Sequence, residues 1–93
     1  MADKKLEGTV VGEKLRNRVV EIIMEQLGIL HKEVVTLEAE LAADLGASGL
    51  KITEIFLALQ DEFGVRFPDK EAEKLTTVGK LLAYLERNGA SIQ

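Results

Sequence analysis

The sequence has no cysteine and no tryptophan, only one proline and one histidine, and an aromatic content of 4%. Without cysteine there is no disulfide framework, no thiol nucleophile and no cysteine-based zinc site. Because aromatic residues are scarce, the core must be built from Leu, Ile, Val and Ala, which favours helices over a β-sandwich or barrel. A chain of 93 residues, 46% of them hydrophobic, suits one domain with one core.

Long apolar segments are also missing. No apolar run is long enough to cross a bilayer, and the N-terminus does not resemble a signal peptide. We therefore expect a protein of the cytoplasm, or of an organelle matrix, that has no membrane span. We also expect a monomer.

The formal net charge of -4 is distributed unevenly along the chain. Residues 21–63 hold nine acidic and two basic residues, a net charge of -7, whereas residues 1–20 carry +2 and residues 64–93 carry +1. An acidic surface repels phosphate backbones, so we expect no nucleic-acid binding. It favours partners with basic surfaces, unless it only keeps the protein soluble.

Hydrophobic periodicity predicts a helix in each half of the chain. Apolar residues recur at helical spacing from about Gly12, and Gly28 suits a left-handed cap that ends this first helix. A long loop follows, in which residues 38–43 form a candidate helical turn. Ser48 is predicted to cap a second helix that ends at Gly64.

The last third of the chain predicts one short helix and one longer one. Residues 69–75 have the length of a short helix, and Thr76 or Thr77 offers a cap for a last helix that stops at Asn88. We expect an all-α four-helix bundle over residues 11–88, with three main helices, a short third helix and a long first loop. Residues 1–10 are predicted to be a flexible tail, and residues 89–93 a C-terminal tail.

The sequence offers no set of residues for catalysis or metal binding. His31 is the only histidine, and without clustered ligands we expect it to lie on the surface or to pack in its loop. The neighbouring acids Glu38 and Glu40, or Asp61 and Glu62, are better explained by a solvated surface than by paired catalytic carboxylates. We therefore expect a protein that is not an enzyme itself.

Four segments together resemble an acyl carrier protein over roughly residues 12–87, in the same order and at nearly the same spacing. They are Glu25–Gly28, Asp44–Ala47, Ala58–Gly64 and Phe67–Gly79. The resemblance implies a carrier of fatty-acid, lipid or polyketide metabolism. In that family an Asp-Ser-Leu triplet begins the second helix, and its serine hydroxyl is esterified with 4′-phosphopantetheine.

The chain departs from the family at that triplet, which reads Ser48, Gly49, Leu50. Gap-free counting from both sides places Gly49 at the attachment position and Ser48 at the aspartate position, so the modified hydroxyl is absent from its expected place. Lys51 stands where the family usually has an acid.

The resemblance also implies a partner surface on the second helix. In the family this helix binds basic surfaces of acyl-handling enzymes and of the phosphopantetheinyl transferase, and the matching residues here are Leu50, Lys51, Glu54, Asp61 and Glu62. Leu59, Phe63 and Leu81, with apolar loop residues, are candidates to line an acyl pocket, unless they form ordinary core.

Three interpretations remain open. Ser48 is a phosphopantetheine site shifted by one residue, although successive helical positions point about 100° apart. Alternatively, the chain is an unmodified relative that binds partners through its surface, or a carrier altered in the laboratory to block modification. A pure adaptor needs an exposed apolar patch, for which Ile52 or Phe56 is a candidate.

Overall fold

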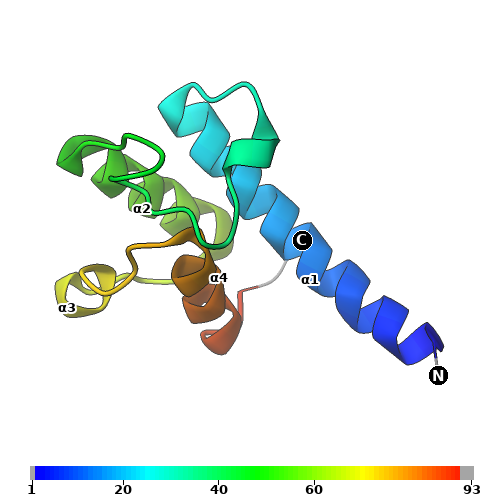
Figure 1. The fold of residues 1–93 in the computed structure, drawn as a ribbon. Helices are drawn as coiled ribbons and strands as arrows, with labels where there is room; N and C mark the ends of the chain where they lie inside the picture. The colour runs from blue at the N-terminus through cyan, green and yellow to red at the C-terminus, as the bar shows by residue number, and fades with distance from the viewer. Residues whose placement is uncertain (1, 91–93) are drawn as a thin grey trace.

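The computed structural model describes the backbone of residues 2–90 and the side chains of residues 12–90. Met1 and residues 91–93 of the predicted C-terminal tail lie outside the described residues. The described chain is a helical bundle without a named strand (Figure 1), which confirms the expected all-α fold with a long first loop and a short third helix. Its elements are α1 (Ala2–Leu27), the 3₁₀ turn η1 (Lys32–Val34), α2 (Gly49–Phe63), α3 (Asp69–Ala72) and α4 (Val78–Arg87).

The first helix is longer than its hydrophobic pattern. It begins at Ala2 and ends at Leu27, where Gly28 adopts the expected left-handed conformation with φ of 69°. The backbone is thus helical through most of the segment for which we expected a flexible tail, and it extends past the other helices (Figure 1). Five of residues 2–10 are Ala, Lys, Leu or Glu, which have high helix propensity, and no proline interrupts the segment, although Gly8, Thr9 and Val10 are poorer helix formers.

The long first loop is ordered by the start of α4. Glu40 and Thr77 form an isolated antiparallel bridge, and the amide of Leu41 donates to the carbonyl of Thr76 at 3.0 Å. Further along, the Gly79 amide donates to the Leu37 carbonyl at 2.8 Å. The helical turn expected at residues 38–43 lies slightly later, at 41–45. These contacts hold the loop against the start of α4 before the chain enters α2.

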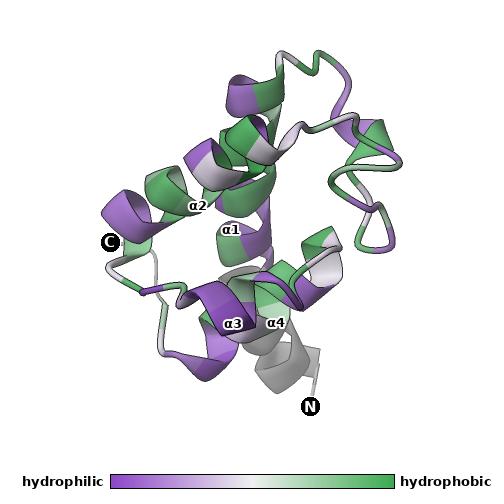
Figure 2. Cartoon of the chain, turned by 90° about the vertical axis from the view of Figure 1, so that its left-hand side faces the viewer, coloured by the Kyte–Doolittle hydropathy of each residue, from purple (hydrophilic) through white to green (hydrophobic). Residues whose placement is uncertain are grey.

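The core lies between α1, α2 and α4, whose hydrophobic residues face one another (Figure 2). The short α3 is mostly hydrophilic in the same view. The largest fully buried side chains are aliphatic, as the shortage of aromatic residues predicts: Ile23, Leu41, Ile55, Leu59, Leu81, Leu85, Val19 and Val78. Burial of this face of α2 directs its opposite side, together with the first turn, toward solvent.

Three of the four aromatic residues form one small cluster beside the link from α2 to α3. The ring of Phe67 lies 4.9 Å from that of Phe56 and 5.3 Å from that of Tyr84, measured between centroids. The Tyr84 hydroxyl donates to the backbone carbonyl of Arg66 at 3.0 Å, so this buried phenol has a partner. The cluster fixes the extended link, and hence α3, against the end of the bundle.

Candidate functional site

The second helix begins at the position that the sequence predicts. Ser48 is its N-cap, with an extended backbone, and its Oγ accepts a hydrogen bond of 3.2 Å from the amide of Lys51. At the other end the helix stops at Gly64, as expected, and this glycine adopts the left-handed conformation with φ of 69°. The Ser48 hydroxyl is therefore turned back over the first helical turn, where it satisfies an otherwise unpaired amide.

Gly49 is the first residue of α2 and lies in open surroundings. A Cβ atom built on this glycine would meet no heavy atom within 4 Å, and the backbone is not in the left-handed region. A serine would therefore fit here without strain or collision, and its hydroxyl would face solvent. Nothing in the fold requires glycine at this position.

The charged residues of α2 are largely paired within the chain. Lys51 Nζ lies 3.2 Å from Glu54 Oε1, and Glu62 forms two hydrogen bonds with Arg18 of α1, at 2.9 and 3.0 Å. Asp61 is exposed and makes no ion pair with the side chains described over residues 12–90. Of the three acids predicted to meet partners, two thus already have a basic partner in the same molecule.

The pair between α1 and α2 also changes the acidity of its members. Hydrogen bonds from the Arg18 guanidinium lower the pKa of the Glu62 carboxyl below its ordinary value of 4.5. Hydrogen bonds to Glu62 and Glu21 raise the pKa of Arg18. Both groups remain charged at neutral pH, so the C-terminal half of α2 stays tied to α1.

The apolar surface of α2 differs from the one expected. Leu50 is 69% exposed and Leu57 is 53% exposed, whereas Phe56 is buried and Ile52 is half-buried. Ile52 and Phe56, the residues proposed for an exposed patch, therefore turn toward the bundle and α3. Leu57 was missed, although its spacing of seven residues from Leu50, two helical turns, places both on one side of the helix.

Two hollows lie between α2 and α3. One, of about 520 Å³, is lined by Phe56, Phe67 and residues around them, and the other, of about 260 Å³, is lined by loop residues that include Leu41 and Ala42. Leu59 and Leu81 are fully buried core residues and line neither hollow, and Phe63 is half-buried and also lines neither. These three residues therefore line neither hollow, and the burial of Leu59 and Leu81 agrees with the alternative that they form ordinary core.

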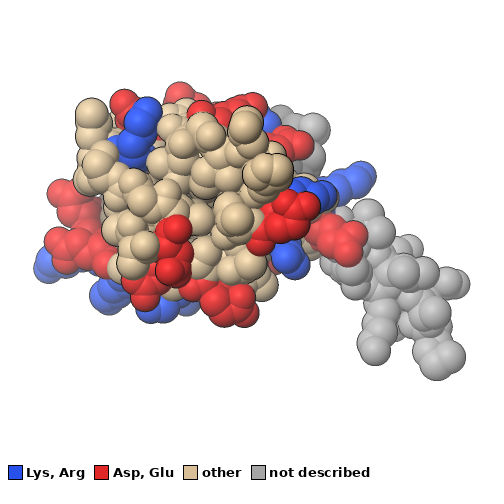
Figure 3. Space-filling model, turned by 45° about the horizontal axis from the view of Figure 1, so that its top comes forward, with Lys and Arg blue, Asp and Glu red and all other residues tan. Residues whose placement is uncertain are grey.

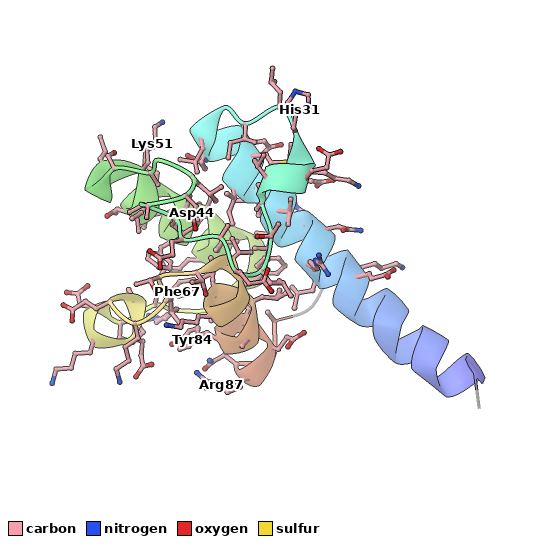
Figure 4. All side chains as sticks on the ribbon, in the orientation of Figure 1. His31, Asp44, Lys51, Phe67, Tyr84 and Arg87 are labelled. Atoms are coloured by element: carbon pink, nitrogen blue, oxygen red, sulfur yellow. The ribbon has the colours of Figure 1, made fainter. Side chains whose placement is uncertain are left out.

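The described part of the chain gives little support for a functional histidine, a metal site or a membrane span. His31 is exposed beside η1, as expected, and points away from the bundle at the top of Figure 4. Over the described residues, no group of three or more His, Cys, Asp or Glu side chains is arranged to hold a metal ion. The described helices also include none that is long and apolar enough to span a membrane.

One comparison with known families bears on this site. A family model described as "Phosphopantetheine attachment site" matches residues 17–85, about three quarters of the chain. The match includes all of α2 and the loop before it, and therefore both Ser48 and Gly49.

Proposed function

The chain belongs to the phosphopantetheine-attachment family, and from that membership we propose that it is an acyl-carrier-type protein of fatty-acid, lipid or polyketide metabolism. Domains of this family are carriers that present cargo to other enzymes, so the chain is not an enzyme itself. Its α2 is the surface that meets acyl-handling enzymes. We further propose that it works in the cytoplasm as a monomer.

The proposed protein works without 4′-phosphopantetheine, because neither residue at the start of α2 fits the group. Gly49, at the family's attachment position, has no side chain to esterify. The Ser48 hydroxyl lies one position earlier and is engaged with the Lys51 amide at 3.2 Å. Because transfer to a hydroxyl needs the nucleophile placed to within about an ångström, a shifted serine is a poor substitute.

The observation that carries this proposal is the open space around Gly49. If glycine were needed to relieve a close contact, its presence would have a purely structural cause, but no atom lies within 4 Å of the added Cβ. The fold thus tolerates a hydroxyl where the family needs one, and the chain lacks it. This combination supports a carrier fold whose cargo attachment is lost.

The partners of this surface are enzymes that handle acyl chains. The net charge of -7 over residues 21–63 favours enzymes with basic surfaces, most directly near Asp61, the acid of α2 without a described ion pair. The exposed Leu50 and Leu57 favour a second candidate, an adaptor that binds other proteins through the same helix without any acyl chemistry.

Intact-mass spectrometry tests the proposal. The wild-type chain and Gly49→Ser are each incubated with coenzyme A and a broad-specificity phosphopantetheinyl transferase. We expect no change in mass for the wild type and the addition of one phosphopantetheine to Gly49→Ser. Ser48→Asp in the Gly49→Ser background is the matched control, since aspartate keeps the cap and removes the Ser48 hydroxyl.

Addition of one group to the wild-type chain, mapped by fragmentation to Ser48, would contradict the proposal. If Gly49→Ser stays unmodified while circular dichroism shows it to be folded, α2 no longer binds the family's modifying enzyme. That result would favour the adaptor.

A further inference from the structure

The end of α4 contains an asparagine that is followed directly by a glycine. Asn88 is the C-cap of the helix, and Gly89 continues the chain with a left-handed φ of 77°. Both residues are exposed, so water and base can reach them. The side-chain carbonyl carbon of an asparagine is an electrophile for the next backbone nitrogen, and a glycine there has no side chain to hinder the approach. This pair therefore has the chemistry for spontaneous deamidation.

The fold holds both reacting groups in hydrogen bonds. The side-chain nitrogen of Asn88, Nδ2, donates to the Tyr84 carbonyl at 2.8 Å, which keeps the side-chain amide against the last turn of α4. The backbone nitrogen of Gly89, which is the nucleophile, donates to the Glu86 carbonyl at 3.2 Å. The two groups are thus fixed at the helix end, and they meet only when this turn opens.

We propose that Asn88 is a site of spontaneous modification whose rate is set by the opening of the last turn of α4. When the turn opens, a base takes the proton of the Gly89 amide, and the nitrogen attacks Asn88 Cγ. The new N–C bond forms, the Cγ–Nδ2 bond breaks, and ammonia leaves with a proton from water. Water then adds to either carbonyl of the cyclic imide and opens it to aspartate or isoaspartate. Nothing is oxidised or reduced, and water is the only co-reactant.

Opening of this turn does not require unfolding of the bundle. Leu85, which is fully buried, precedes the turn, whereas Glu86, Arg87 and Asn88 are exposed. Figure 4 shows Arg87 at the outer end of α4. Exposed helix ends open at a lower free energy than the core does. The folded protein therefore reaches the reactive state more often than global unfolding would allow.

Modification removes a contact that closes the helix. A carboxylate cannot donate a hydrogen bond, so the Tyr84 carbonyl loses the Nδ2 donor. The new negative charge also lies at the C-terminal end of α4, which is already partly negative. Because the ring of Tyr84 lies 5.3 Å from that of Phe67, the loss occurs beside the cluster that holds the link to α3. The product should be less stable than the parent protein.

Incubation of the full chain at mildly alkaline pH and physiological temperature tests the site. Peptide mapping by mass spectrometry detects the gain of about one dalton at Asn88. Anion-exchange chromatography retains the protein through acidic groups such as those at the margin of the face in Figure 3, and the product, which has one more negative charge, elutes later. We expect the folded chain to react about ten- to a hundred-fold more slowly than the chain unfolded in guanidinium chloride.

Two matched variants separate local from global opening. Glu86→Gly and Glu25→Gly each replace an exposed glutamate in the last turn of a helix that ends in a left-handed glycine, at α4 and α1 respectively. Both replacements lower helix propensity equally. In the folded protein we expect Glu86→Gly to react about three- to five-fold faster than the wild type, and Glu25→Gly to differ from it by less than about two-fold.

A third variant measures the consequence for stability. Asn88→Asp reproduces the aspartate product, and we expect it to lower the midpoint of thermal unfolding by about 2–5 °C. An unchanged midpoint would overturn the predicted effect on stability.

Three results would overturn the site itself. An unfolded chain that does not react at Asn88 would lack the chemistry, and equal rates in the folded and unfolded chains would mean that the helix end does not control the reaction. Equal rates in Glu86→Gly and Glu25→Gly would mean that opening of the last turn of α4 is not the route. None of these results bears on the proposed function, because no partner and no prosthetic group takes part in the reaction.

Discussion

The two capped helices of this protein, α2 and α4, begin in the same way but in different surroundings. Each has a hydroxyl residue as its N-cap, and in each the hydroxyl oxygen accepts a hydrogen bond of 3.2 Å from the amide of a lysine three residues later. Around α4, however, the first residue, Val78, is fully buried, and its amide donates to the Ala39 carbonyl at 3.1 Å. Around α2 the first residue, Gly49, is exposed and open.

The caps of the two helices have the same structural role, whereas the surroundings of their first turns differ. Thr77 caps α4, a helix whose first residue is buried in the core, so its hydroxyl has a structural role there. The Ser48 hydroxyl has the same geometry, and capping of α2 is enough to explain it. What distinguishes α2 is the open space around Gly49 and the exposure of its first three residues, Gly49, Leu50 and Lys51. The start of α4 holds the first loop in place, whereas the start of α2 is available to a partner.

Truncation of an apolar residue in each first turn should give the largest contrast. Val78→Ala removes two buried methyl groups and should lower the free energy of unfolding by about 2–3 kcal/mol. Leu50→Ala removes an exposed side chain and should change it by less than about 0.5 kcal/mol. Urea unfolding followed by circular dichroism measures both, and equal losses would contradict the contrast.

A serine introduced at the glycine of each first turn should give the next largest contrast. A Cβ at Gly79 would lie 3.0 Å from the Leu37 carbonyl oxygen, so Gly79→Ser should cost about 1–2 kcal/mol as the loop is pushed away from α4. Gly49→Ser meets nothing and should be neutral within about 0.5 kcal/mol. The midpoints of thermal unfolding compare the two variants directly, and a destabilised Gly49→Ser would mean that glycine has a structural role there.

Removal of the cap should affect both helices by a similar, smaller amount. Ser48→Ala and Thr77→Ala each leave one amide without its hydroxyl acceptor and should cost about 1 kcal/mol. Ser48→Asp should keep the stability of the wild type, because a carboxylate caps equally well. If Ser48→Ala were neutral in urea unfolding while Thr77→Ala was not, the Ser48 hydroxyl would be free for another purpose.

Much of this fold could be predicted from local signals. Periodic apolar residues located the core faces of α1 and α4, and Ser48, Gly64 and Thr77 marked helix ends through their own backbone chemistry. The start of α1 was not predicted, because the first ten residues lack the apolar period that marks a packed helix. Their propensity was the available signal, and it is a weaker one.

The site was predictable where it depends on position along one helix, and not where it depends on contacts between helices. Counting placed Gly49 and Ser48 at the start of α2, as the structure has them. The pairing of Glu62 with Arg18 joins residues 44 positions apart, and no sequence pattern in one chain reports such a contact. The exposure of Leu50 likewise depends on which side of α2 the other helices cover.

The most direct test of the central claim is the intact mass of the protein purified from the cells that produce it naturally. The account predicts the mass of a chain that carries no phosphopantetheine, even when an ordinary carrier from the same cells is fully modified. A mass increased by one phosphopantetheine, located on Ser48, would contradict it, since the hydroxyl assigned to capping α2 would then be the point where cargo is attached.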